Sequence, residues 1–460
     1  MEISLLPDFS PSDVATWAGG EWTRDPLGQI TSVHHDTRTV QKGSLYVALK
    51  GARVDGHDLI PQAIEQGAVG VLCKKGRAIE HPDAPCLEVE DVEAALGDVA
   101  NGHRSRCQGH LIAITGSAGK TTVKDFLAAM CRAAGSTCST PGNWNNFIGL
   151  PLSMLRMETT DAFGVFELGM NHAGEIRRLA KILEPDLGGI TSIGEAHLEQ
   201  LGSVLAIAQE KTSLFASLQS TGFCLVDMDS DWKDLMVAQA GCTFHTYSLY
   251  EDADLMGRAI PDQPEVLVIE DRVRGERWEI EVPLPGEHMR KNLLLAIGLA
   301  RQVGVTPDQI RGGLNTYKGS PLRWEISKIG SLQIINDAYN ANPLSMKCAI
   351  KAFAEQEDPL PAWVVLGEMA ELGSSAQEFH TTLGRTIDSF GLEGMITVGA
   401  AGKWIAEGVE QTRIHVVNDV DEATDAVVDH VPDAARLLVK ASRSVGLESL
   451  VDALNSRKNS

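Results

Sequence analysis

The sequence lacks an excess of basic residues: its 40 lysines and arginines are outnumbered by 62 aspartates and glutamates, which gives a formal net charge of −22. A field of this sign repels nucleic acid and anionic membrane surfaces, so we expect neither as a partner. A polyphosphate substrate would have to be held by a few local cations.

Long apolar runs are also missing. No stretch approaches the roughly 18 residues of a membrane span, and acids occupy the N-terminal stretch where a signal peptide would carry a basic region. The eight cysteines are scattered, with no CxxC pair and no metal-ligand spacing. We therefore expect a cytoplasmic protein without membrane insertion, whose thiols are reduced and mostly structural.

The length of 460 residues corresponds to about three domains of roughly 150 residues each. There is no internal repeat and no low-complexity tract. We place the boundaries at 1–105, 106–320 and 321–460. The first unit reads as a small α/β module, with strands at 44–49 and 68–73 around a helix near 59–66.

Strands and helices alternate through the other two units, which predicts mostly parallel sheets with helices on both faces. The β-rich stretch 219–284 interrupts this alternation, and we expect it at the edge of the central sheet. The last unit carries short apolar strands between helical patterns, which is typical of a doubly wound, Rossmann-like sheet, although it has no GxGxxG. The fold class is therefore α/β with three domains.

The nonamer ITGSAGKTT, 114–122, is the strongest motif. It follows the apolar strand LIAI and opens a helix whose apolar residues repeat at helical spacing. Glycines allow a tight turn that aims backbone N–H groups at one point, and the helix N-terminus adds partial positive charge. We expect a phosphate-binding loop made of Gly116, Ser117, Ala118, Gly119, Lys120, Thr121 and Thr122. The alternative is a glycine-rich turn that binds nothing.

Three charged side chains follow strands of the central unit. Glu167 closes the strand FGVFE, where a carboxylate can face a Mg²⁺ ion at the loop. His197 lies on a loop after the strand at 187–194, and Lys211 lies on the next helix. Each has a plain alternative: a solvated strand end, a structural histidine and a surface lysine.

Two polar runs lack a helical or strand pattern. Residues 139–151 contain Asn143, Asn145 and Asn146, whose amides suit phosphate or carboxylate oxygens. Residues 336–346 follow a strand and precede a helix that we expect to be capped near Asn342. Capping leaves Asp337, Tyr339 and Asn340 unexplained, so we consider a binding role for this second run.

Together these runs resemble the Mur ligase family, the ATP-dependent amide-forming enzymes of peptidoglycan precursor synthesis. The matching segments span nearly the whole chain: DTR and LKGARVDGHD, then TGSAGKTT, GNWNNFIGLP, ELGMNHAGEI and IGEAHLEQLGS, then YNANPLSM, LGEMAELG and LVKASRS. YNANPLSM and LGEMAELG are most similar to the branch that joins D-alanyl-D-alanine to UDP-MurNAc-tripeptide.

The resemblance implies a monomer that uses ATP and Mg²⁺, with UDP-MurNAc-tripeptide and D-Ala-D-Ala as its small-molecule substrates. It assigns ATP binding to the phosphate loop and to Asn146 (or Asn145), Asn292, Arg323 and Asp337. It assigns catalysis to Lys120, Glu167, His197 and Lys211. The implied metal ligands are Thr121, Glu167, His197 and Lys211, the lysine as a carbamate formed with CO₂. The implied substrate-binding residues are Thr37, Arg38, Tyr339, Asn340 and Asn342.

The chain departs from the family pattern at four positions: Met289, Asn336, Glu368 and Ala441. None of these removes an implied metal or phosphate ligand. Three rival functions stay open on the residues alone: a sibling ligase with a different acceptor, a P-loop phosphotransferase or NTPase without an acyl acceptor, and a non-catalytic UDP-sugar-binding relative. The complete set of implied metal-site residues disfavours the last.

Overall fold

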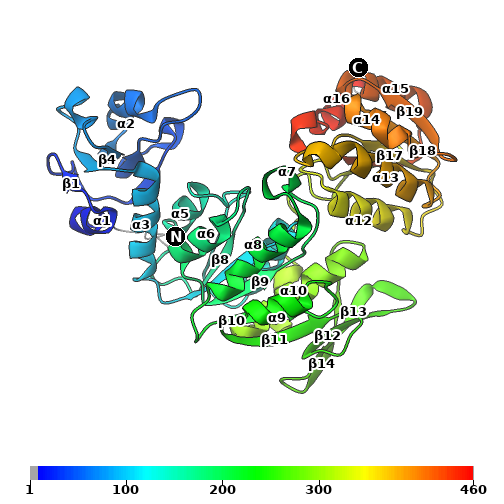
Figure 1. The fold of residues 1–460 in the computed structure, drawn as a ribbon, viewed down its shortest axis with the longest axis horizontal. Coiled ribbons are helices and arrows are strands. Elements are labelled where there is room, and N and C mark those ends of the chain that lie inside the picture. Colours follow the sequence, from blue (N-terminus) through cyan, green and yellow to red (C-terminus); the bar gives the residue numbers. More distant parts are fainter. Residues whose placement is uncertain (1–8, 459–460) are drawn as a thin grey trace.

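The computed structural model describes residues 9–458, so residues 1–8 of the acidic N-terminal stretch lie outside it. The described chain forms three α/β domains, each built on its own sheet, and they follow one another along the chain (Figure 1). This confirms the predicted fold class. Among residues 9–458, no helix is both long and apolar enough to cross a bilayer.

The N-terminal domain has a five-stranded sheet in the order β1-β5-β4-β3-β2, parallel except for β1. Its strands are β1 (Glu21–Trp22), β2 (Ser32–His34), β3 (Ser44–Val47), β4 (Ala68–Lys74) and β5 (Cys86–Val89). Its helices are α1 (Pro11–Ala18), α2 (Ile60–Glu65) and α3 (Val92–Arg104), with 3₁₀ turns η1 (Thr37–Thr39), η2 (Gly56–Leu59) and η3 (Ala78–Glu80). Helix α3 also packs on helices of the central domain, which joins the two units.

The central domain has a nine-stranded sheet in the order β14-β13-β12-β11-β10-β9-β6-β8-β7. The strands from β7 to β12 run parallel, and β12, β13 and β14 form an antiparallel ribbon at one edge, as expected for the β-rich stretch. The strands are β6 (His110–Thr115), β7 (Thr137–Ser139), β8 (Phe163–Glu167), β9 (Leu187–Ile190), β10 (Phe223–Asp227), β11 (Thr243–Ser248), β12 (Leu255–Ile260), β13 (Gln263–Asp271) and β14 (Glu276–Glu281).

Alternating side chains of the central strands enter two separate cores. In β6, Leu111 and Ala113 pack into one core, whereas Ile112 and Ile114 pack into the other. Helices α5 (Gly149–Met154), α6 (Glu175–Leu183), α8 (Val204–Ala216) and α9 (Lys233–Gln239) bury residues in the first core. The second is covered by α4 (Lys120–Arg132), α10 (Glu287–Gln302) and α11 (Pro307–Leu314). The short helix α7 (Leu198–Leu201) extends toward the C-terminal domain (Figure 1).

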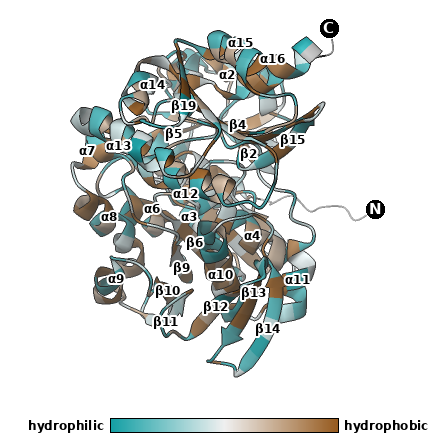
Figure 2. Cartoon of the chain, turned by 90° about the vertical axis from the view of Figure 1, so that its right-hand side faces the viewer, coloured by the Kyte–Doolittle hydropathy of each residue, from teal (hydrophilic) through white to brown (hydrophobic). Residues whose placement is uncertain are grey.

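The C-terminal domain has a six-stranded sheet in the order β15-β16-β20-β17-β18-β19, parallel except for β15. Its strands are β15 (Glu325–Ile329), β16 (Leu332–Asn336), β17 (Ala362–Leu366), β18 (Gly394–Val398), β19 (Arg413–Val417) and β20 (Arg436–Lys440). Its helices are α12 (Pro343–Ala354), α13 (Ala376–Asp388), α14 (Gly399–Ala406), α15 (Val420–His430) and α16 (Glu448–Lys458), with 3₁₀ turns η4 (Gly373–Ser375) and η5 (Arg443–Val445). The surface helix α16 carries both hydrophilic and hydrophobic residues (Figure 2).

The order of the parallel strands determines where polar side chains meet. In the central sheet β6 lies between β8 and β9, so their carboxyl ends bring together the phosphate loop, Glu167 and the segment after Ile190. In the C-terminal sheet β20 lies between β16 and β17, which brings Lys440 beside Asp337. Ligands of open α/β sheets bind beyond such strand ends.

Candidate functional site

The phosphate loop connects β6 to α4 and is held against the segment that follows β9. Ser117 N donates to Ser192 O at 2.8 Å, and Ser117 Oγ donates to Gly194 O at 2.9 Å. Gly116 has φ +153°, and a Cβ there would lie 1.9 Å from Thr191 Oγ1. The loop therefore has one rigid shape that only glycine permits at this position.

Lys120, the first residue of α4, folds back over the loop, and its Nζ donates to Gly116 O at 2.9 Å. Burial lowers the pKa of Lys120, the nearby Glu167 raises it, and Arg323 lowers it. The lysine thus lies between a carboxylate of the central domain and an arginine that leads into the C-terminal domain.

Asn292 of α10 packs directly against the phosphate loop. Gly119 has φ +83°, and a Cβ there would approach the Asn292 amide nitrogen and oxygen to 2.7 Å. Glycine at position 119 suits the left-handed backbone, and a Cβ there would force the Asn292 amide to shift away from the loop.

Replacing Gly119 by alanine should weaken nucleotide binding about 10- to 100-fold, because overpacking of this kind costs about 1–3 kcal/mol. Gly304 is the control: it has a similar φ of +86°, but nothing lies within 4 Å of its Cβ position. Calorimetric titration with ADP measures both variants. Equal losses in Gly119→Ala and Gly304→Ala would show that the contact with Asn292 is unimportant.

Glu167 is 2% exposed, and neutral groups hold both of its carboxylate oxygens. Thr121 Oγ1 donates to Oε2 at 2.8 Å, and Asn145 Nδ2 donates to Oε1 at 2.8 Å. Glu167 N donates to the Thr140 hydroxyl at 3.0 Å, which fixes the end of β8. The carboxylate therefore faces the start of α4 beside a hydroxyl, a pair of oxygen ligands that Mg²⁺ accepts.

The two candidate asparagines have different surroundings. Asn145 reaches Glu167, whereas Asn146 Oδ1 accepts from Ile148 N at 3.2 Å and from Gly149 N at 2.8 Å. Asn146 thus shapes its own loop at the start of α5. The contacts favour Asn145 for a role at the metal and phosphate edge.

Lys211 of α8 is 1% exposed, and no carboxylate of the described residues lies within ion-pair distance of its Nζ. Burial places the pKa of Lys211 well below its usual value, and the charge of Lys120 lowers it further. The carboxylate of the neighbouring Glu210 binds the backbone at the start of α6: it accepts from Gly174 N at 2.7 Å and from Ile176 N at 2.8 Å. Glu210 and Glu167 raise the pKa of Lys211 through their charges, but neither forms an ion pair with this buried amine.

His197 immediately precedes α7 and has φ +59°. Its Nδ1 lies 2.5 Å from Oε2 of Glu371, which belongs to the C-terminal domain between β17 and η4. Contact with His197 lowers the pKa of Glu371. Among the described residues the ion-pair partner of His197 is Glu371, not Glu167.

The C-terminal domain brings three charged groups together near the loop. The Arg323 guanidinium lies 4.0 Å from the centre of the Tyr339 ring. Lys440 Nζ lies 2.7 Å from Asp337 Oδ2 and also donates to Asn340 O at 3.0 Å. Arginine, tyrosine and carboxylate side chains here can stack on a base or accept ribose hydroxyls.

Asn342 forms hydrogen bonds through both ends of its side-chain amide. Its Oδ1 accepts from Ser345 N at 2.8 Å and caps α12, as the sequence predicts. Its Nδ2 donates to Ser117 O of the phosphate loop at 3.1 Å. This side chain therefore connects the C-terminal domain to the loop, and both ends of its amide are engaged in this structure.

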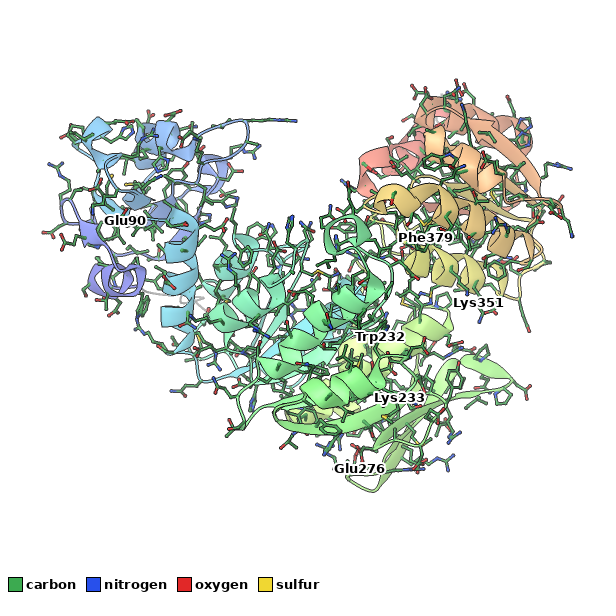
Figure 3. All side chains as sticks on the ribbon, in the orientation of Figure 1. Glu90, Trp232, Lys233, Glu276, Lys351 and Phe379 are labelled. Atoms are coloured by element: carbon green, nitrogen blue, oxygen red, sulfur yellow. The ribbon has the colours of Figure 1, made fainter. Side chains whose placement is uncertain are left out.

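Thr37 and Arg38 lie in η1 of the N-terminal domain, apart from the groups around the phosphate loop. Thr37 is buried, while Arg38 is exposed and pairs with Asp36 at 2.6 Å. A surface depression of about 750 Å³ lies on the β12–β14 ribbon, where Arg258, Glu270 and Glu276 help line it. Figure 3 places Glu276 at the outer end of the central domain.

Sequence reasoning overlooked Thr140 and Glu371 as partners of Glu167 and His197. Thr140 lies in the polar run at 139–151 and Glu371 in the run LGEMAELG, but no spacing rule pairs them with their partners. Three-dimensional contact alone reveals these pairs.

Models of three Mur ligase domains match the chain in order. They are the Mur ligase family catalytic domain at residues 29–104, the middle domain at 114–300 and the glutamate ligase domain at 322–443. The UDP-N-acetylmuramoyl-tripeptide–D-alanyl-D-alanine ligase of Bacillus subtilis is 33% identical over 92% of this chain and 93% of its own length. The enzyme of the same name from Escherichia coli is 31% identical over 92% and 94%.

Solved structures of Mur ligases are also similar to this chain. MurF from Acinetobacter baumannii superposes with a TM-score of 0.89 at 28% identity, covering 98% of this chain and 100% of that one. MurF ligase from Thermotoga maritima, solved in complex with ADP, gives a TM-score of 0.82 over 93% and 98% of the chains, but its 24% identity bears on the fold alone. The chain therefore belongs to the Mur ligase family. It is an ATP-dependent ligase.

Proposed function

We propose that this enzyme joins D-alanyl-D-alanine to the terminal carboxylate of UDP-MurNAc-tripeptide, giving UDP-MurNAc-pentapeptide, ADP and phosphate. The observation that carries the proposal is the similarity to ligases of that name over more than nine-tenths of the chain. The site supports it, because a phosphate loop, a buried carboxylate and groups of the C-terminal domain converge at one place.

The reaction that suits these groups is acyl activation. A carboxylate oxygen of the tripeptide attacks the γ-phosphorus of ATP, the bond to ADP breaks, and an acyl phosphate forms. The amine of D-Ala-D-Ala then attacks the acyl carbon, loses a proton, and phosphate leaves. Lys120 and the loop N–H groups stabilise charge on the transferred phosphoryl group, which is the main catalytic need of such transfers.

The residues present fit a Mg²⁺ ion only if ligands beyond the usual acids take part. Within residues 9–458 no three histidine, cysteine, aspartate or glutamate side chains gather in a metal-binding cluster. Thr121 and Glu167 would supply two oxygens, and His197 and carbamylated Lys211 would complete the protein ligands. The metal, when bound, neutralises charge on the phosphates.

Lys211 is suited to carbamylation because only a neutral amine adds CO₂, and burial lowers the pKa of this amine, which favours its neutral form. The amine nitrogen forms a bond to the carbon of CO₂ and loses a proton, which leaves an anionic oxygen ligand where an ammonium would repel the metal.

The substrate positions that we propose are those that the family resemblance implies, and they involve all three domains. We place the adenine and ribose against Asn292, Arg323 and Asp337, the phosphates on the loop, and the uridine end of the nucleotide sugar at Thr37 and Arg38. Tyr339, Asn340 and Asn342 would line the acceptor side. We also infer that the enzyme works in the cytoplasm, where ATP is available, and as a monomer.

Isotope transfer tests the acyl phosphate. With ¹⁸O in the terminal carboxylate of the tripeptide, one ¹⁸O should appear in the released phosphate, because that oxygen attacks ATP and leaves with the phosphoryl group. Phosphate that acquires oxygen only from solvent would contradict the proposal and favour a bare NTPase.

Acceptor profiling separates this enzyme from sibling ligases. D-Ala-D-Ala should be used in preference to single amino acids, as in the relatives named for that dipeptide. A preference for a single amino acid would assign the chain to a different branch of the family.

Replacing Asn145 by alanine should raise the Mg²⁺ concentration for half-maximal activity at least about tenfold, because a hydrogen bond to a charged group contributes about 1.5–3 kcal/mol. Asn146→Ala should leave that concentration nearly unchanged, since its amide bonds only to its own loop. Magnesium titration of initial rates measures both. A larger shift in Asn146→Ala would reverse the assignment.

A further inference from the structure

His197 and Glu371 lie where the central and C-terminal domains meet, and the two segments contact each other through both side chains and backbone. The side chains meet at 2.5 Å between Nδ1 and Oε2. The backbones meet as well, since Glu199 N donates to Glu371 O at 3.0 Å. Figure 1 shows α7, which follows His197, lying beside the C-terminal domain. The position of His197 is therefore coupled to the docking of that domain.

Both residues of the pair have strained backbones. His197 has φ +59° and Glu371 has φ +62°, in the left-handed region that side chains other than glycine adopt at a cost. Gly373 of the same segment lies against Glu199 and also has a positive φ, +56°, which glycine adopts at little cost. Two strained residues facing each other across a domain boundary indicate that the contact is imposed by the surrounding structure.

A salt bridge for stability alone does not account for this arrangement. The His197 side chain is 21% exposed and that of Glu371 is 46% exposed, and ion pairs at such positions add little to stability. The strain on two backbones is therefore not offset by the charge pair itself. A role in placing the imidazole explains the geometry better.

The chemistry of imidazole defines that role. The Glu371 carboxylate lies at ion-pair distance from Nδ1, although the pair does not have ordinary hydrogen-bond geometry in this structure. A negative charge at that position favours the tautomer with the proton on Nδ1, which leaves the lone pair on Nε2. No hydrogen bond within residues 9–458 engages Nε2. Histidines that bind metals usually donate their other ring N–H to such a carboxylate, which orients the ring and raises its basicity.

We propose that Glu371 is a positioning residue of the C-terminal domain that orients His197 for metal binding, so that docking of this domain completes the metal site. The proposal rests on the metal site of the proposed function. It adds that the Mg²⁺ affinity depends on a carboxylate from a domain that supplies none of the direct ligands.

Manganese binding tests the proposal with the full chain in the presence of ADP. Electron paramagnetic resonance measures free Mn²⁺, and electron spin-echo modulation detects an imidazole nitrogen on the bound ion. Glu371→Gln should weaken Mn²⁺ binding about 10- to 100-fold and reduce the nitrogen signal. Glu371→Gly should do the same while relieving the positive φ, so a folding defect is not expected. Glu199→Gln, an exposed neighbour at the same contact, is the control and should change neither quantity.

Three results would overturn the inference: unchanged Mn²⁺ affinity in both Glu371 variants, tighter binding in those variants, which would mean that the carboxylate competes with the metal, or an unchanged nitrogen signal in His197→Ala. The proposed function can fail separately. Wild-type protein that shows the imidazole signal and its loss in Glu371→Gln, but forms no amide bond, would support the role of Glu371 and contradict the ligase assignment.

Discussion

Replacing Lys120 by methionine should lower kcat/KM for ligation by about 10²–10³-fold, the loss typical of removing one preorganised group that stabilises transition-state charge. The chain has a net charge of −22, so the phosphates depend on local cations. Lys120 is the cation of the loop itself, and its Nζ now bonds Gly116 O, within reach of any phosphate bound there. Steady-state phosphate release measures the effect.

Lys181→Met is the matched control for this variant. Lys181 belongs to α6 of the same domain, is exposed, and forms no side-chain ion pair in the described residues. Its replacement should change kcat/KM less than twofold, a rough bound for surface substitutions. Equal kcat/KM values for Lys120→Met and Lys181→Met would show that the loop lysine does not contribute to the reaction.

Replacing Lys211 by methionine should abolish most ligase activity, by about 10²-fold or more, because it removes the proposed carbamate ligand and its charge. The folded protein should be at least as stable as the wild type, since methionine fills the site without burying an unpaired amine. Activity assays and thermal unfolding together separate these two effects.

Lys124→Met provides the contrast, because Lys124 is also buried but has partners. Its Nζ donates to Thr140 O at 2.9 Å and lies 2.9 Å from Asp125 Oδ1. Its loss should lower the melting temperature. With ¹³C-bicarbonate, a carbamate resonance should appear in the wild type and in Lys124→Met but not in Lys211→Met. A resonance that persists in Lys211→Met would place the carbamate elsewhere or exclude it.

The sequence predicted elements whose pattern is local. The strand that leads into ITGSAGKTT ends at Thr115, the second residue of the motif, and the helix begins at Lys120. Both were predictable because glycine spacing and helical periodicity are short-range signals. The ribbon β12–β14 was likewise expected at the sheet edge, since alternating charged and apolar residues suit a half-exposed strand. The exact domain boundaries and the roles of the site residues stay predictions.

Other features depend on contacts that no local pattern encodes. Asn145 and Asn146 are chemically identical neighbours in an irregular loop, and only the fold directs one to Glu167 and the other to Gly149. The pairing of His197 with Glu371 joins separate domains and requires left-handed backbone at residues that do not favour it. Secondary-structure propensity predicts neither the asparagine contacts nor the pairing of His197 with Glu371, because tertiary packing determines both.

The most direct test of the ligase assignment is phosphate release from ATP with UDP-MurNAc-tripeptide and D-Ala-D-Ala, omitting each in turn, followed by mass spectrometry of the product. We expect release only when both are present, together with the mass of UDP-MurNAc-pentapeptide. Release that is indifferent to both substrates, with no new amide product, would contradict the account.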